Sequence, residues 1–209
     1  MARIVLFLLL LSCGMQENQG SEKGFQTYLA GLFLQTSYFE CGKNKFADHL
    51  NFDDATNDVK IGFLRVSPEN LNVQDLRGGS IQNQPDYLKL NLKFPSIPEI
   101  INIDFPPANS ENVDLQFAFH FFLPDKISVG IFHYYHGEKK PVYWNHFNVQ
   151  VIEQNQEIGT CGKPIKNSST LEFNCEKSLL PVLTNLNNAH SFNVHVVYRD
   201  ESNTYQDCY

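Results

Sequence analysis

The features that identify common enzymes, nucleic-acid-binding proteins and membrane proteins are missing from this 209-residue sequence. It contains no Gly-x-Ser-x-Gly, no His-Glu-x-x-His and no phosphate-binding glycine loop, so nothing indicates the usual hydrolase, metalloprotease or nucleotide sites. It also lacks a basic block, and 23 acidic against 16 basic residues give a net charge of −7. That balance argues against a nucleic-acid partner. We therefore expect no enzyme and no cofactor, and favour a binding protein.

The one unbroken apolar run of any length is at the N-terminus. Ile4–Leu11 follows the positive charge of Arg3, and small residues come directly after it, which predicts a signal peptide over residues 1–14. The run is shorter than the ~20 residues that a membrane span needs, so no span is expected. The alternative is a bacterial lipoprotein that is lipid-anchored at Cys13.

Once the signal is removed, the rest of the chain is expected to be secreted. Residues 15–28 are polar and predict a flexible N-terminal tail. The remaining residues, 29–209, are enough for a single domain with one core. Asn167 begins the sequence Asn-Ser-Ser, which is a glycosylation acceptor in an exported protein.

An even number of cysteines follows the predicted signal peptide, and in an exported chain this indicates two disulfides. Three pairings are open, and we favour a short local loop together with a long closure of the chain ends. The predicted pairs are Cys161–Cys175 and Cys41–Cys208. Close Cys-x-x-Cys pairs, which are typical of zinc sites, are absent.

Apolar residues alternate with polar ones along much of the chain, a period of two that predicts strands with one buried face. The clearest run spans 113–121 and places Phe117 and Phe119 in the core, with Gln116 on the opposite face. Further runs cover residues 88–94, 101–105, 147–151 and 192–198. We therefore predict an all-β fold, an antiparallel β-sandwich with two disulfides.

Turn residues separate these runs. Arg77–Ser80 predicts a turn, and His136–Pro141 predicts the loop of a hairpin between two aromatic-rich runs. Residues 42–58 are polar and predict a loop, and a short helix is expected over Glu176–Leu186.

Two groups of side chains suggest metal chemistry. Histidines 120, 133, 136 and 146 lie on or beside predicted neighbouring strands, so a metal-dependent enzyme using His residues is the third hypothesis for function. Aspartates 48, 53, 54 and 58 crowd the predicted loop, but their spacing does not match an EF-hand. Surface histidines and a solvated acidic loop are the simpler interpretations of both groups.

From residue 35 to 152 the order of motifs resembles that of the H-type lectins, the family of the snail agglutinins and the discoidin C-terminal domains. The motifs that carry the resemblance are Gln35-Thr36-Ser37 with Cys41-Gly42, Pro98–Ile103, Asn112–Phe121, Ile127–Ile131, Tyr135-His136 and Val142–Ile152. Residues 153–209 lie outside it as a C-terminal extension. Asp114 stands where the family carries a sugar-binding arginine.

The resemblance implies an extracellular, carbohydrate-binding protein with an adhesive or defensive role that forms a homo-oligomer. Tyr135 and His136 would contact the sugar, by ring stacking and by a hydrogen bond, and Asp114 would accept a second hydrogen bond. The partners would be glycans or a cell-surface glycoprotein. The alternative is a secreted β-sandwich module that binds a protein or an apolar ligand without sugar specificity.

Overall fold

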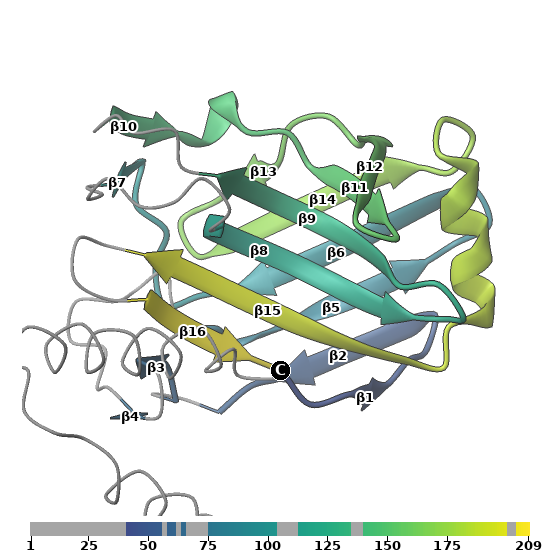
Figure 1. The fold of residues 1–209 in the computed structure, drawn as a ribbon, viewed down its shortest axis with the longest axis horizontal. Helices are drawn as coiled ribbons and strands as arrows, with labels where there is room; N and C mark the ends of the chain where they lie inside the picture. The colour runs from purple at the N-terminus through teal and green to yellow at the C-terminus, as the bar shows by residue number, and fades with distance from the viewer. Residues whose placement is uncertain are drawn as a thin grey trace, which may run out of the picture. The chain divides into compact units, whose positions relative to one another are not determined.

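Two antiparallel β-sheets form the body of the protein in the computed structural model (Figure 1). The structure describes residues 41–55, 58–61, 64–65, 75–103, 113–134, 140–199 and 204–209. Both disulfides form as the sequence predicts, Cys41 with Cys208 and Cys161 with Cys175. The all-β sandwich with two disulfides is therefore confirmed. None of the helices in the described ranges is long and apolar enough to cross a membrane.

The larger sheet has β8 and β15 at its centre (Figure 1). Its strands follow one another in space as β12 (Gln156–Thr160), β11 (Gln150–Glu153), β9 (Ile127–Tyr134), β8 (Val113–Phe122), β15 (Ser191–Arg199), β16 (Thr204–Cys208), β3 (Lys60–Ile61) and β4 (Leu64–Arg65). A short strand, β1 (Asn44–Lys45), also pairs with β15.

The smaller sheet has five strands, and a two-stranded sheet accompanies it. The five run in the order β13 (Ile165–Lys166), β14 (Thr170–Glu176), β6 (Tyr87–Lys93), β5 (Gly78–Asn83) and β2 (His49–Asp53). The pair consists of β7 (Ile100–Ile103) and β10 (Lys140–Tyr143), and the helical segments are η1 (Trp144–His146) and η2 (Pro181–Asn188).

The core lies between the two main sheets and is rich in phenylalanine. Phe117 and Phe119 on β8 are fully buried, as their alternation predicted. Phe94, which follows β6, meets Phe117 edge to face with ring centroids 5.6 Å apart. Phe52 on β2 meets Phe119 at 6.2 Å. These ring contacts join the smaller sheet to the larger one.

The turn predicted over Arg77–Ser80 is the start of strand β5. Gly78 has a φ of 125°, which side-chain-bearing residues rarely adopt, and it pairs with Asp53 of β2. A Cβ on Gly79 would clash with the carbonyl oxygen of Asn91 and would come 2.7 Å from the Phe52 ring. The two glycines allow the Phe52 ring and the neighbouring strands to approach β5, so here they serve packing within the sheet.

Two other local predictions are also corrected. The predicted loop over residues 42–58 contains β1 and β2, because Phe52 and Phe46 bury apolar rings within an otherwise polar segment. The helix predicted over Glu176–Leu186 is a 3₁₀ helix that begins at Pro181. Its hydrogen bonds span three residues, as in the bond from the Leu183 N–H to the Leu180 carbonyl.

The predicted hairpin around His136–Pro141 is wrong. Strand β9 pairs with β8 and β11 in the larger sheet, whereas β10 pairs with β7. The chain therefore changes sheets between residues 134 and 140. Sequence alternation identifies both strands but does not say which partner each one takes.

The disulfides fasten different parts of the sandwich. Cys161, directly after β12 of the larger sheet, is bonded to Cys175 on β14 of the smaller one. Cys41, before β1, is bonded to Cys208 on the C-terminal strand β16, across 167 residues of sequence. The second disulfide places β16 beside the early part of the chain, where the candidate site is found.

Candidate functional site

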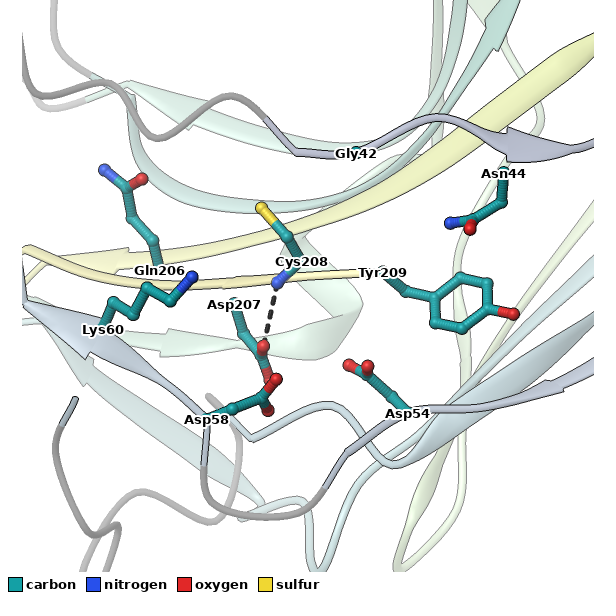
Figure 2. Close-up of a pocket in the computed structure, with 9 residues that line it drawn as sticks. All are labelled: Gly42, Asn44, Asp54, Asp58, Lys60, Gln206, Asp207, Cys208 and Tyr209. Atoms are coloured by element: carbon teal, nitrogen blue, oxygen red, sulfur yellow. Dashed lines mark hydrogen bonds between the residues drawn. The ribbon is translucent and has the colours of Figure 1, made fainter. Parts of the chain in front are cut away.

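An acidic pocket lies where β16 passes the segment that follows β2 (Figure 2). The cavity has a volume of about 250 Å³. Its lining comes from two parts of the chain that are distant in sequence, one between residues 42 and 60 and the other at residues 206–209. These residues are Gly42, Asn44, Asp54, Asp58, Lys60, Gln206, Asp207, Cys208 and Tyr209.

Three carboxylates gather in this pocket. Asp54 and Asp58 follow β2, and Asp207 belongs to β16. One carboxylate oxygen from each lies within 4.8 Å of the others. Three negative charges at this separation repel one another strongly, more so away from water. The pocket therefore favours any proton or cation that reduces its negative charge.

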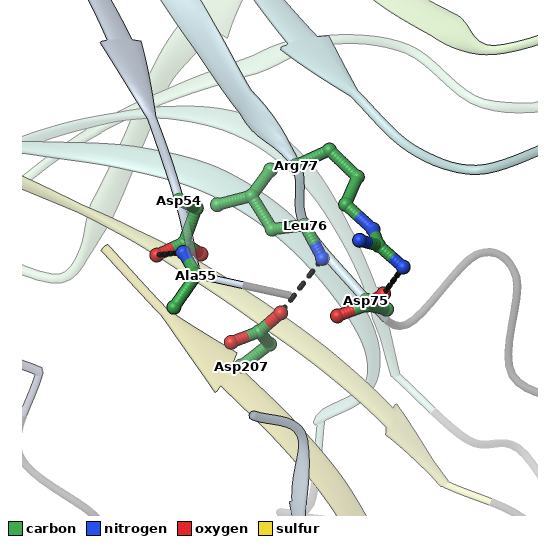
Figure 3. Close-up of polar contacts among 6 residues, drawn as sticks. All are labelled: Asp54, Ala55, Asp75, Leu76, Arg77 and Asp207. Carbon is green, nitrogen blue, oxygen red and sulfur yellow. Dashed lines mark hydrogen bonds and ion pairs between the residues drawn. The ribbon is translucent and has the colours of Figure 1, made fainter. Parts of the chain in front are cut away.

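Asp207 is the most deeply placed of the three, with a relative exposure of 3%. Its Oδ2 accepts a hydrogen bond from the Leu76 N–H at 2.7 Å, and its Oδ1 accepts one from its neighbour, the Cys208 N–H, at 2.8 Å (Figure 3 shows the first). Leu76 lies just before β5. The carboxyl group thus ties the C-terminal strand to the smaller sheet.

Asp54 is less buried and less completely bonded. Its Oδ1 accepts a hydrogen bond from the Ala55 N–H at 3.0 Å. Its Oδ2 is a buried atom with no hydrogen-bond partner in the described part of the chain. A buried carboxylate oxygen without a donor is costly, typically by ~1–3 kcal/mol. A proton, or a donor from a ligand, would therefore stabilise this atom.

Burial and like charge shift the titration of both residues. Loss of water around Asp54, and next the charge of Asp58, raise its pKa from 3.8 to about 7. Burial raises the pKa of Asp207 to about 8, with further contributions from Asp54 and Asp58, although its two N–H donors oppose the shift. At neutral pH the pocket therefore holds protons that ordinary aspartates would have lost.

Positive side chains also lie near the cluster. Lys60 on β3 lines the pocket. Arg77 forms an ion pair with Asp75, whose side chain is fully buried (Figure 3). Arg77 is thus engaged one residue beyond Leu76, the residue that donates to Asp207. These cations offset only part of the acidic charge around the pocket.

Part of this cluster is visible in the sequence pattern. Of the four aspartates in that pattern, the structure brings Asp54 and Asp58 together. Asp48 instead accepts a 2.7 Å hydrogen bond from the Asn83 side chain, and Asp53 is exposed on β2. Both oxygens of Asp207 and one of Asp54 already accept main-chain N–H groups. The three residues alone therefore fall short of the six to eight oxygens that calcium takes.

Asp207 is not marked by any local pattern of residues, although the predicted disulfide points to it indirectly. Its neighbour Cys208 was predicted to bond to Cys41, which lies on the same N-terminal side of the domain as Asp54 and precedes it by 13 residues. Combining the disulfide with the acidic segment would have brought Asp207 close to Asp54 and Asp58. No motif marks the residue on its own.

The predicted histidine site does not form from the described residues. His120 lies on β8, where the Gln116 amide donates to its Nε2 at 2.9 Å and its Nδ1–H donates to Ser128 Oγ at 2.7 Å. Both ring nitrogens are therefore occupied, and burial lowers the pKa of His120 to about 3. His146 lies in η1, exposed and beside the Tyr143 ring. The side chains of His133 and His136 lie outside the described residues.

The residues predicted to contact sugar fall mostly outside the described residues too. This applies to Tyr135 and His136. Asp114 lies on β8 next to Val113, which pairs with Tyr134 of β9, but its side chain is not among those described. Asn167 is exposed in the tight turn between β13 and β14, where its N–H donates to the Thr170 carbonyl. Asp114 and Asn167 keep their predicted roles as predictions.

The chain was compared with protein-family models, curated proteins and solved structures. No family model, curated protein or solved structure matches it. The similarity to H-type lectins therefore stays a prediction from sequence motifs, and the site has to be interpreted from its own geometry.

Proposed function

We propose that the protein is a secreted recognition protein that binds a protein partner by receiving an arginine or lysine side chain in the acidic pocket. One observation carries the proposal: three carboxylates from two distant segments converge within 4.8 Å in a cavity. Carboxylates are the strongest hydrogen-bond acceptors a protein offers to guanidinium and ammonium groups.

The size of the cavity supports a single side chain as its occupant. At about 250 Å³ it is smaller than pockets for drug-sized molecules, which measure roughly 300–1,000 Å³. Tyr209 also lines the cavity (Figure 2), and its ring is held there by stacking on Phe52, with ring centroids 4.3 Å apart. Arginine is also enriched among the residues that dominate protein interfaces.

The charge of the whole chain supports the same class of partner. With a net charge of −7 the protein attracts basic surfaces, which raises the rate of encounter with them. The two disulfides fit an oxidising environment, in agreement with the signal peptide expected over residues 1–14. An exposed Asn167 fits a glycosylated surface.

The proposal is tested by titrating the purified protein with Nα-acetyl-arginine methylamide and monitoring NMR chemical shifts. The titration is done at about pH 8.5, above the pKa of Asp54 and of Asp207. We expect binding at about millimolar Kd, as suits one isolated side chain. Asp54→Asn should weaken it by about tenfold or more, because a charge-assisted hydrogen bond is worth ~1.5–3 kcal/mol.

Two controls accompany the titration. Asp125→Asn makes the same chemical change in the exposed turn between β8 and β9 and should leave the Kd unchanged. The neutral analogue Nα-acetyl-norleucine methylamide should not bind. Absence of arginine binding, equal binding by norleucine, or tight binding of CaCl₂ alone with none of the arginine probe would each overturn the proposal.

A further inference from the structure

The acidic pocket joins three segments of the chain through one buried carboxyl group. Asp207 belongs to β16, and it accepts the N–H of Leu76, which lies just before β5. Asp54 and Asp58 face it from the segment that follows β2 (Figure 2). Any change in the charge of this cluster therefore acts both on the cavity and on the attachment of the C-terminal strand.

The charges around the cluster can be assigned to elements. The charged residues of the described chain that face it are Asp54, Asp58, Lys60, Asp75, Arg77 and Asp207. Four are acidic and two are basic, and Arg77 is already ion-paired with Asp75. If every group were ionised, the cluster would carry an excess of negative charge in a largely buried place, which is unfavourable.

We infer that the pocket is gated by protons, so that it accepts the basic side chain of a partner only as its carboxyl groups lose their protons. This inference rests on the proposed function and adds its regulation. When the basic group enters, the O–H bond of a carboxyl group breaks, the proton passes to solvent, and the carboxylate pairs with the incoming cation. Recognition should therefore strengthen as the pH rises.

The titration of the two aspartates sets the range in which the gate works. Burial raises the pKa of Asp54 to about 7 and that of Asp207 to about 8, as described above. Both protons are therefore retained in mildly acidic surroundings and lost in mildly alkaline ones. Neither arginine nor lysine changes charge over this interval, so the protein and not the ligand determines the pH dependence.

The same protons govern the stability of the unliganded protein. The unfolded chain loses them at the ordinary value of 3.8, whereas the folded chain keeps them to about 7 and about 8. Between these limits the folded state binds more protons, so its stability falls as the pH rises. Asp54→Asn removes one titrating group, and its amide can donate to a neighbouring carboxylate.

The first arm of the test measures Tm against pH without any ligand. The wild type should lose about 5 °C or more between about pH 6.5 and about pH 8.5. Asp54→Asn should lose clearly less and melt higher than the wild type at the alkaline end. Asp125→Asn, an exposed aspartate in a turn, should follow the wild type throughout.

The second arm measures the Kd of Nα-acetyl-arginine methylamide over the same pH range. We expect binding to tighten by about tenfold as one proton is displaced, and isothermal titration in two buffers of different ionisation enthalpy should detect the released proton.

The two arms separate failure of the inference from failure of the proposed function. If the probe binds with the same Kd at every pH, the gate is refuted while the binding site stands. If the probe binds nowhere but the wild-type Tm falls as predicted, the proposed function fails, and with it the gate. A Tm that does not change with pH would show that the folded protein does not retain these protons, and this would refute the inference.

Discussion

Two polar regions of this sandwich are largely buried, and they differ in how burial affects their titratable groups. One is the acidic pocket. The other is a histidine cluster on the face of the larger sheet opposite the core, formed by Gln116, His120, Ser128 and His195. Burial lowers the pKa of His120 to about 3 and that of His195 to about 4, so both rings are neutral at physiological pH.

The difference between the regions indicates where function lies. In the histidine cluster the titratable groups are neutral, and both nitrogens of His120 are bonded within the sheet, although His195 Nε2 has no hydrogen-bond partner among the described residues. In the acidic pocket, acidic charge exceeds basic charge, and Asp54 Oδ2 has no hydrogen-bond partner among the described residues. The two regions therefore differ in charge: the histidine cluster is neutral, whereas the pocket concentrates carboxyl groups whose ionised forms favour a cation.

The largest effect is expected from opening the disulfide that borders both regions. Cys41→Ala with Cys208→Ala should destabilise by ~5 kcal/mol, because the bond closes a long loop in the unfolded chain. The Cys161–Cys175 disulfide closes only a short loop, so Cys161→Ala with Cys175→Ala should cost ~3 kcal/mol. Denaturant unfolding of both double variants gives the comparison.

The two double variants should differ most clearly in their effect on the acidic pocket. Opening Cys41–Cys208 should abolish the alkaline loss of stability and the binding of the arginine probe, since β16 carries Asp207. Opening Cys161–Cys175 should leave both intact. Equal free-energy losses in the two double variants, with equal effects on the pocket, would contradict the account.

A smaller effect is expected in the histidine cluster. Gln116→Ala leaves His120 Nε2 buried without its donor and should cost ~1–3 kcal/mol. The sequence pattern had placed Gln116 on an open face, where the same change would be nearly silent. Denaturant unfolding decides between these interpretations, and a loss under ~0.5 kcal/mol would show that the network is not important. The pH dependence of the probe's Kd should not change in this variant.

The smallest effect concerns mildly acidic pH, where the two regions oppose each other. The histidines are neutral in the fold, so stability is lost as the pH falls below 6.5, their ordinary pKa, toward about 4 and about 3. Over much of the same interval the pocket aspartates act in the opposite direction, because they are protonated in the folded state and ionised in the unfolded chain, so their contribution to stability increases as the pH falls. The wild-type Tm should therefore be nearly level between about pH 4 and about pH 6.5.

Removing one aspartate should expose the contribution of the histidines. In Asp54→Asn the Tm should begin to fall close to pH 6.5, the point at which the unfolded histidines take up protons. Differential scanning calorimetry in small pH steps would detect this. Identical acid profiles for the wild type and this variant would show that the two regions do not offset each other.

The sequence predicted the parts of the fold that depend on local periodicity. The alternation around Phe117 and Phe119 identified β8 and its buried face, and the even cysteine count indicated two disulfides, of which the favoured pairing among three is the one that forms. Pairing of strands was harder, because β9 and β10 look like a hairpin yet belong to different sheets. Alternation records which face is buried and not which strand lies alongside.

Only part of the candidate site could be predicted from the sequence, for a similar reason. Asp54 and Asp58 stood out because they are close in sequence, whereas Asp207 joins them only through the fold. The outward face of β8 was also misjudged, since polar alternation indicates a solvent face while Gln116 is 9% exposed. Long-range contacts and buried polar networks are not encoded in any local pattern.

The most direct test of the central claim is a ¹³C NMR titration of the aspartate side-chain carboxyl groups, assigned with Asp54→Asn and Asp207→Asn. Our account predicts two carboxyl groups with midpoints far above 3.8, about 7 for Asp54 and about 8 for Asp207. The midpoint of Asp54 should fall when the arginine probe is present. If both aspartates titrate below about pH 5, as ordinary carboxyl groups do, the pocket holds no protons at neutral pH and the account is contradicted.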